Sequence, residues 1–200
     1  MADQETSSRA RLFIALEVPE PVKQRLGEVQ SQLRGKVPNA AIKWIPEERL
    51  HLTLRFLGYV EREQVPDLTK AAQVASGAFP PLALGVGEVG FFPNAQRPRI
   101  VWVGMSEREN LLGQLAREVQ TATLPFTAEE PADRFSAHIT IGRVKGIARP
   151  QAVILGNSAE KFAGRVLGEW VGNECVLMES RLSAKGPTYQ VLAKLAFRGE

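Results

Sequence analysis

Both histidines of this 200-residue chain occur in the same four-residue pattern, in which a histidine and a threonine alternate with apolar residues. The pattern reads HLTL at residues 51–54 and HITI at residues 138–141. In a β-strand, residues two apart point to the same face. Each pattern therefore presents an imidazole beside a hydroxyl on one face of a strand, with its apolar pair on the other.

Two such pairs facing one pocket would supply an acid and a base for a phosphate ester. Imidazole gains and loses a proton near neutral pH, so one of His51 and His138 could take a proton from water while the other protonates the leaving oxygen. The hydroxyls of Thr53 and Thr140 would hydrogen-bond the non-bridging oxygens. This scheme requires no metal, and it suits hydrolysis of a 2′,3′-cyclic phosphate or attack by a neighbouring 2′-hydroxyl. The alternative interpretation is two half-buried strand histidines without a chemical role.

Two arginines are candidate phosphate ligands. Arg55 lies four residues after His51, so an unbroken strand places it on the histidine face. Arg143 lies five residues after His138, and strict alternation would point it away. Gly142 immediately before it could mark a β-bulge that turns Arg143 inward. The sequence thus predicts both arginines at the substrate.

Aromatic side chains could stack on a nucleobase. The strands and their ends offer Phe13, Trp44, Phe56, Phe92 and Tyr189. Most aromatic residues in such strands belong to the core, and we expect this of Phe56. Trp44 and Tyr189 are kept as candidate substrate-binding residues.

The composition restricts the class of protein. Apolar residues make up 44% of the chain and the formal net charge is +3, which suits an anionic substrate without requiring one. A single cysteine, Cys175, excludes an internal disulfide, and two histidines with one cysteine fall short of the usual zinc ligand clusters. We therefore expect no metal and no cofactor. The polar start of the chain lacks a signal peptide, and no apolar run approaches membrane-spanning length, so we expect a cytoplasmic protein.

Periodicity predicts short strands alternating with helices. Apolar residues four, three and four apart indicate a helix over 21–33, and a capping-box pattern at Ser106 and Glu109 indicates one from there to about 121. A third helix is expected over 61–75, and 150–162 reads as partly helical, while 164–170 is ambiguous. Strands are expected at 12–16, 42–45, 50–57, 82–89, 99–105, 135–144, 174–182 and 189–197, the last two joined by a loop at 183–188.

The two histidine strands belong to an internal near-repeat. Each follows a polar, turn-rich segment, at 46–49 and at 129–134, and precedes a segment that contains a helix. Short loops and hairpins favour an antiparallel α+β fold over a doubly wound parallel sheet. A duplicated unit tends to pack with approximate two-fold symmetry, which would bring the two histidine patterns face to face across a cleft.

The chain resembles the 2H phosphoesterase superfamily, and within it the bacterial and archaeal RNA 2′,3′-cyclic phosphodiesterases, also called 2′-5′ RNA ligases. The resemblance extends from about residue 10 to residue 198. It rests on the paired patterns with their flanks and on RLFIAL at 11–16, WIP at 44–46, LHLTLRFLG at 50–58, FSAHITIGRV at 135–144, SRL at 180–182 and GPTY at 186–189.

The resemblance implies one domain over 10–198, built of two intertwined, pseudo-symmetric lobes of antiparallel sheet with helices outside and a central basic cleft. Residues 1–9 are expected to form a flexible leader. It also implies hydrolysis of RNA 2′,3′-cyclic phosphate ends to 2′-phosphates without metal or cofactor, and the reverse 2′-5′ ligation. By the same resemblance, His51 is the proton donor and His138 the proton acceptor. RNA ends or nucleoside 2′,3′-cyclic phosphates are the expected partners, and we expect a monomer.

Two other hypotheses fit the same residues. One is a phosphodiesterase for another small cyclic phosphate, such as ADP-ribose 1″,2″-cyclic phosphate. The other is a non-catalytic module that binds RNA ends, whose affinity would survive loss of the histidines and fall steeply with salt.

Overall fold

A computed structural model describes residues 8–38, 40–107, 109–131, 134–184 and 186–199 of the chain. The strands are β1 (Arg9–Glu17), β2 (Ile42–Trp44), β3 (His51–Glu61), β4 (Leu82–Phe92), β5 (Ile100–Ser106), β6 (His138–Val144), β7 (Val166–Gly172), β8 (Glu174–Ser183) and β9 (Gly186–Ala196). The α-helices are α2 (Glu20–Arg34), α3 (Val65–Gly77), α4 (Leu111–Thr123) and α5 (Arg149–Ala159). Short 3₁₀ turns are η1 (Glu47–Arg49), η2 (Arg62–Gln64), η3 (Leu124–Phe126) and η4 (Glu160–Phe162).

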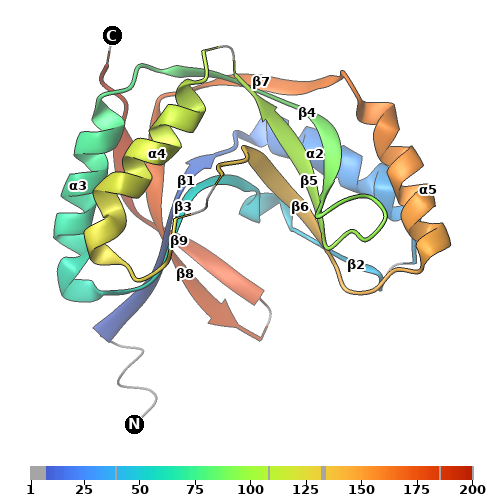
Figure 1. Cartoon of the computed structure of the whole chain (residues 1–200), viewed down its shortest axis with the longest axis horizontal. Helices are drawn as coiled ribbons and strands as arrows, with labels where there is room; N and C mark the ends of the chain where they lie inside the picture. The colour runs from blue at the N-terminus through green and yellow to red at the C-terminus, as the bar shows by residue number, and fades with distance from the viewer. Residues whose placement is uncertain (1–7, 39, 108, 132–133, 185, 200) are drawn as a thin grey trace.

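The strands form one antiparallel sheet that consists of two halves. Its order is β7-β4-β5-β6-β3-β1-β8-β9, with β2 paired to the side of β6. The register between β6 and β3 holds through a single pair, Leu52 opposite Ile139, whereas β1 pairs with β3 along the whole of β1. The sheet therefore bends at the β3–β6 seam, and Figure 1 shows the two halves diverging from it.

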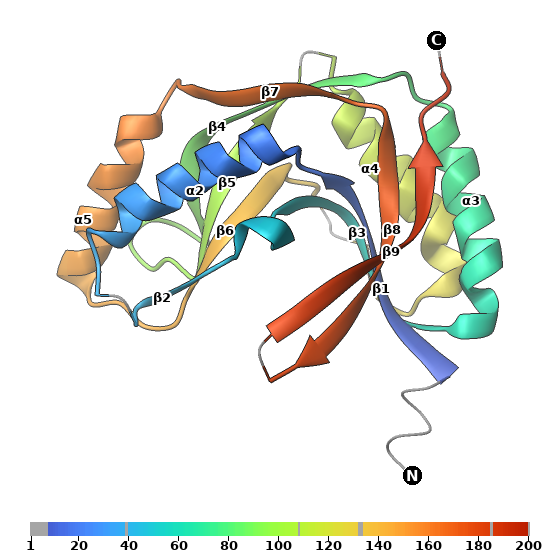
Figure 2. The same cartoon turned by 180° about the vertical axis from the view of Figure 1, so that it is seen from behind.

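Each half carries two helices on its outer face. Helices α3 and α4 pack on each other and on the half made of β3, β1, β8 and β9, whereas α2 and α5 pack on the half that contains β4, β6 and β7. Figures 1 and 2 show these helix pairs at opposite ends of the molecule. The chain passes repeatedly from one half to the other, so the halves are interleaved in sequence. This arrangement confirms the predicted α+β fold with two antiparallel lobes.

Helices α2 and α3 show how the sequence specifies the outer layer. In α2 the buried apolar residues are those of the predicted stripe, Val22, Leu26, Val29 and Leu33, each at most 4% exposed. The predicted helix at 61–75 contains a proline that should break it. In the structure α3 begins at Val65, so Pro66 occupies its first turn, where its missing N–H costs no helical hydrogen bond. No helix in the described residues is both long and apolar enough to span a membrane.

Several predicted boundaries are wrong. Ser106 is the last residue of β5 and does not cap a helix; the carboxylate of Glu107 instead accepts the backbone N–H of Leu112 in the first turn of α4. The hairpin between β8 and β9 is tighter than the predicted loop, since Ser183 already pairs with Gly186. Arg9, expected to belong to a leader over 1–9, is the first residue of β1, and residues 1–7 lie outside the described part.

Candidate active site

The two histidine patterns meet at the seam between the halves. Leu52 and Ile139, the apolar residues that follow the histidines, are fully buried and pair directly. Because neighbouring residues of a strand alternate between faces, the histidines and threonines on either side of this pair share the opposite face. Continuing the antiparallel register sets His51 toward Thr140 and Thr53 toward His138. The predicted imidazole–hydroxyl pairs thus come together.

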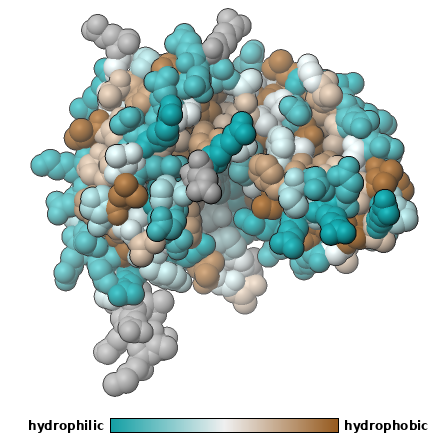
Figure 3. Space-filling view, in the orientation of Figure 1, coloured by the Kyte–Doolittle hydropathy of each residue, from teal (hydrophilic) through white to brown (hydrophobic). Residues whose placement is uncertain are grey.

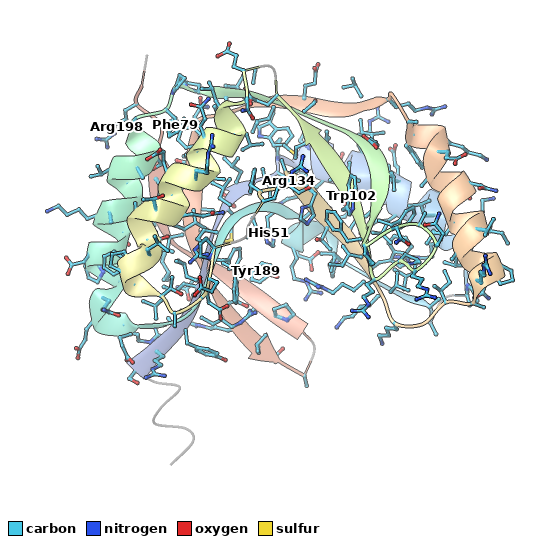
Figure 4. The ribbon with its side chains drawn as sticks, in the orientation of Figure 1. His51, Phe79, Trp102, Arg134, Tyr189 and Arg198 are labelled. Carbon is cyan, nitrogen blue, oxygen red and sulfur yellow. The ribbon has the colours of Figure 1, made fainter. Side chains whose placement is uncertain are left out.

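All four side chains line one pocket of about 320 Å³. Figure 3 shows a hollow in the centre of the molecule between the two halves, and Figure 4 shows His51 and Tyr189 beside each other in this region. Four cations stand in the pocket wall, and the described residues of that wall include no carboxylate. The full lining is Arg11, Phe13, Lys43, Trp44, Ile45, Pro46, Arg49, His51, Thr53, Phe56, His138, Thr140, Arg143, Leu182, Pro187 and Tyr189.

Both imidazoles are oriented by the same device. Nδ1 of His51 lies 2.8 Å from the carbonyl oxygen of Arg49, and Nδ1 of His138 lies 2.8 Å from that of Ser136. A carbonyl oxygen can only accept a hydrogen bond, so Nδ1 carries the proton in both rings. Nε2 is then the titrating atom, a base when bare and an acid when protonated. In each case the acceptor is the residue two positions before the histidine, so both halves of the repeat fix the same tautomer.

The two rings differ in what surrounds them. His51 packs against Phe13 and Tyr189, with ring centroids 5.0 and 5.3 Å away. His138 meets the edge of Phe92 at 5.0 Å and lies 6.5 Å from Trp102. Figure 4 shows Trp102 on the β5 side of the site, apart from the His51–Tyr189 pair. Each imidazole thus rests on aromatic side chains from its own half of the molecule.

Burial lowers the pKa of His51 below its usual value of 6.5, because the charged ring loses its hydration. The hydrogen bond to the Arg49 carbonyl opposes this effect, while the positive charges of Arg143, His138 and Lys23 add to it. The fold therefore favours the neutral form of the His51 ring. A bound phosphate would reverse part of this effect, since a nearby anion favours the protonated ring.

A β-bulge turns Arg143 into the pocket. Thr140 pairs with Trp102 and Gly142 with Val101, so Ile141 is an extra residue in β6 that shifts the alternation. Arg143 consequently shares the face of His138 and lines the pocket. Gly142 allows β2 to approach, because a Cβ there would lie 2.9 Å from Cγ2 of Ile42 and 3.2 Å from the Trp44 ring.

Arg55 does not face the pocket, and its predicted position on the histidine face is wrong. Arg55 pairs with Ile14 and Thr53 with Ala15, so the intervening Leu54 is an extra residue and the alternation reverses after it. The Arg55 side chain is 3% exposed and donates from Nη2 to the carbonyl oxygen of Glu129. It ties β3 to the segment that leads into β6.

The same bulge moves Phe56 from its expected core position into the pocket wall. There the guanidinium of Arg11 lies over its ring at 4.7 Å. Trp44 and Tyr189 also line the pocket, where both are half-buried. Among the predicted site residues, only Arg55 is therefore absent from the pocket.

The chain is similar over most of its length to proteins named RNA 2′,3′-cyclic phosphodiesterase. The LigT-like phosphoesterase family matches residues 16–102. A relative of that name from Thermus thermophilus is 34% identical over 197 residues, covering 95% of this chain and 91% of the relative. The chain belongs to the LigT-like phosphoesterase family. Another relative of that name, from Methanocaldococcus jannaschii, is 30% identical over 91% of this chain and 98% of its own.

A solved structure agrees with this assignment. The crystal structure of TT0787 from Thermus thermophilus superimposes with a TM-score of 0.77 at 31% identity, over 95% of this chain and 99% of that one. The resemblance drawn from the sequence motifs is thus confirmed at the level of the family. Membership of the LigT-like phosphoesterases supports a phosphoesterase function for this chain.

Sequence reasoning missed three cations of this LigT-like site, Arg11, Lys43 and Arg49. Arg49 belongs to the 3₁₀ turn η1 just before β3, so the alternation of a strand does not predict its direction. It also donates from Nη1 to the carbonyl oxygen of Pro187 at 3.0 Å, which holds the β8–β9 hairpin over the pocket. Arg11 and Lys43 lie on strands without a motif, so only the tertiary fold assigns them to the site.

Proposed function

We propose that this protein hydrolyses the 2′,3′-cyclic phosphate at RNA ends to a 2′-phosphate, with His51 and His138 as its general acid and base. The observation that carries the proposal is the joining of both imidazole–hydroxyl pairs in one pocket with four cations and no carboxylate among its described lining residues. The names of the relatives from Thermus thermophilus and Methanocaldococcus jannaschii support the choice of substrate.

In the proposed reaction, bare Nε2 of His138 removes a proton from a water molecule. The water oxygen forms a bond to phosphorus, and the bond from phosphorus to the ribose 3′ oxygen breaks. His51, protonated at Nε2, gives its proton to that leaving oxygen, so the phosphate stays on the 2′ oxygen. Each well-placed acid or base contributes about 10²–10⁴-fold in rate. No step in this scheme calls for a metal ion.

The remaining polar groups of the pocket stabilise the charge on the phosphate. The hydroxyls of Thr53 and Thr140 donate to the non-bridging oxygens, and the guanidinium of Arg143 compensates the negative charge that builds on them. The phosphate of the substrate would favour the protonated form of His51 and so oppose the burial that lowers the pKa of this ring. Binding of the anion and protonation of the acid are therefore coupled.

The ribose and base of the terminal nucleotide would occupy the aromatic wall of the pocket. Trp44 offers a half-buried indole whose ring also lies 5.9 Å from the guanidinium of Arg34. Tyr189 packs edge-on against His51, so it combines contact with the substrate and support of the acid. We assign Trp44 to base stacking and Tyr189 to the ribose side.

The same site would join two RNA ends if an RNA 5′-hydroxyl took the place of water. His138 would remove the proton of that hydroxyl, and His51 would again protonate the departing 3′ oxygen. The product is a 2′-5′ linkage, because the 3′ oxygen is again the leaving group.

The test is hydrolysis of a nucleoside 2′,3′-cyclic phosphate in the presence of EDTA, with the position of the product phosphate read by ³¹P NMR. The expected product is the 2′-phosphate, formed at an undiminished rate with EDTA, and its formation should be nearly abolished in His51→Gln and His138→Gln. Wild-type turnover in both variants would refute the mechanism. A competition among cyclic phosphates, including ADP-ribose 1″,2″-cyclic phosphate, identifies the preferred substrate.

A further inference from the structure

The catalytic pocket has room for the end of an RNA and not for its strand. Its volume of about 320 Å³ is at the lower limit of the roughly 300–1,000 Å³ that small-molecule sites enclose. If the substrate is an RNA, as proposed above, the nucleotides that precede its cyclic phosphate must lie on the protein surface outside this pocket. Their phosphates carry one negative charge each, so a cationic surface next to the pocket is the place to look for them.

A second and larger hollow of about 860 Å³, here called the basic hollow, lies between the β4–β5 loop and the start of α5. It is lined by Gln96, Arg97, Pro98, Arg99, Val144, Lys145, Gly146, Ile147 and Arg149. Its four cations are all exposed, no carboxylate lines it, and none of them forms an ion pair within the described part of the chain. Figure 3 shows hydrophilic side chains gathered over this part of the surface.

The basic hollow and the catalytic pocket are lined by consecutive residues at the end of β6. Arg143 lines the pocket, and the two residues that follow it, Val144 and Lys145, line the basic hollow. On the β5 side, the backbone N–H of Val144 donates to the carbonyl oxygen of Arg99 at 2.9 Å, which fixes Arg99 beside the end of β6. Lys145 is the first residue after β6 and follows Arg143 by two positions. The end of β6 therefore carries one cation in the catalytic pocket and the next in the basic hollow.

The hollow beside α4 is a less suitable place for a strand of phosphates. It contains two cations, Arg117 and Arg134, and also the carboxylate of Glu107. That carboxylate accepts the backbone N–H groups of Glu109 and Leu112, so it is held in place at the start of α4. A fixed negative charge would repel a phosphate there, whereas the basic hollow has none among its described lining residues.

We propose that the basic hollow binds the backbone phosphates of the RNA strand on the 5′ side of the reacting end, which makes an oligonucleotide a better substrate than a mononucleotide. This inference rests on the proposed function. Contacts from exposed arginine and lysine to phosphates position a strand without reading its sequence. The basic hollow therefore selects for RNA length and leaves base preference to the catalytic pocket.

The test compares uridine 2′,3′-cyclic phosphate with a pentanucleotide that ends in the same group. We expect kcat/KM of the wild type to be on the order of tenfold higher for the pentanucleotide, through a lower KM. In the double variant Arg99→Glu/Lys145→Glu this advantage should disappear, while kcat/KM for the mononucleotide stays within about twofold, as these residues lie outside the catalytic pocket. The matched control is Lys70→Glu/Lys161→Glu, which changes two exposed lysines elsewhere by the same total charge and should retain the advantage.

Two further measurements complete the test: the salt dependence of affinity, and direct binding without turnover. The slope of log affinity against log salt for the pentanucleotide should fall by about 0.7 for each phosphate contact removed. Binding of a pentanucleotide 2′-phosphate to His138→Gln, followed by fluorescence anisotropy, gives the same comparison without turnover. If the first double variant does not fold, Arg97→Gln/Arg149→Gln replaces it.

The outcomes separate the two proposals. Equal kcat/KM for both substrates in the wild type would overturn RNA binding at the basic hollow and leave the proposed function standing. The same holds if the double variant and its control lose the pentanucleotide advantage to the same extent. No turnover of either substrate would overturn the proposed function. The anisotropy comparison would then still decide whether the basic hollow binds RNA.

Discussion

The two histidine half-sites of this protein share their framework and differ in their surroundings. In both, a strand histidine donates from Nδ1 to the carbonyl oxygen two residues earlier, at the same 2.8 Å. Around His51, however, Phe13 of β1 and Tyr189 of β9 pack against the imidazole and against each other, and together they form its aromatic enclosure. The rings of His138 and Phe92 pack nearly perpendicular to each other. The described residues just before His138, 134–137, are irregular, whereas the 3₁₀ turn η1 precedes His51.

The shared part is what either proton role requires, namely a fixed tautomer whose Nε2 can take up or release a proton. The differing part tunes each ring separately. Burial and neighbouring cations lower the pKa of His51, and a nearby anion would favour its protonated form, which fits the acid role proposed for it. A duplicated unit thus gives two copies of one orienting device, and the packing around each copy sets its role.

The largest expected effect separates the acid from the base. In a nucleoside 2′-(p-nitrophenyl phosphate), attack by the 3′-hydroxyl is the reverse of ring opening, so His51 would remove the proton of that hydroxyl and His138 would face the leaving group. The p-nitrophenolate group leaves without protonation. We therefore expect His138→Gln to lose about 10²–10⁴-fold in kcat on a 2′,3′-cyclic phosphate and to recover most of this on the p-nitrophenyl ester. His51→Gln should lose a similar factor on both substrates. Steady-state kinetics of the two variants on the two esters check the assignment.

Exchange of this pattern between the variants would reverse the roles of the histidines. If both variants recovered kcat equally on the p-nitrophenyl ester, or neither did, the half-sites would not be specialised. Circular dichroism of both variants controls for folding, since the His51 substitution changes a more enclosed position.

A smaller effect is expected at the threonines. Thr53→Val and Thr140→Val keep the branched shape and remove the hydroxyl, so each should reduce kcat by about 10²-fold if its hydroxyl stabilises the transition state. KM should change less than kcat. A change confined to KM would mean that the hydroxyl only binds the ground state, and the measurement is kcat and KM of both variants on the same cyclic phosphate.

We expect the two arginines predicted from the sequence to differ in what their loss affects: catalysis for Arg143 and stability for Arg55. Arg143 is exposed in the pocket, so Arg143→Met should weaken catalysis by about 10- to 100-fold with little change in the free energy of unfolding. Arg55 is buried and bonded to the Glu129 carbonyl, so Arg55→Met should lower the free energy of unfolding by about 1–3 kcal/mol. Urea unfolding and kcat/KM of both variants decide this. A large catalytic loss in Arg55→Met with unchanged stability would contradict the assignment.

These arginines also show where sequence reasoning succeeds and where it stops. The repeated pattern predicted the site, because four residues within one short strand fix their own relative orientation. The α2 stripe and the hairpin of β8 and β9 were likewise local. Arg55 and Arg143 lie beyond a bulge at Leu54 and at Ile141, and a one-residue bulge reverses every later side chain.

A bulge depends on how the neighbouring strand pairs, which a single-strand pattern does not contain. Gly142 gave a local signal for the second bulge, whereas nothing in the sequence around Leu54 marked the first. Arg11 and Lys43 were missed for a related reason. They reach the pocket from strands whose places in the sheet follow from the whole topology.

The smallest expected effect concerns stability, and it probes the enclosure of His51 without substrate. The pKa of His51 is lowered by folding, so below about pH 6.5 the unfolded chain takes up a proton that the folded chain resists. The free energy of unfolding of the wild type should therefore fall as the pH drops from 7.5 toward 5, and this fall should be shallower in His51→Gln. Urea unfolding across that range measures it, with His138→Gln as the variant that should keep most of the slope contributed by His51, because burial is the largest cause of the lowered pKa. Parallel curves for the wild type and His51→Gln would show that the aromatic enclosure does not desolvate the ring, and the distinction between the half-sites would then have to come from the bound substrate alone.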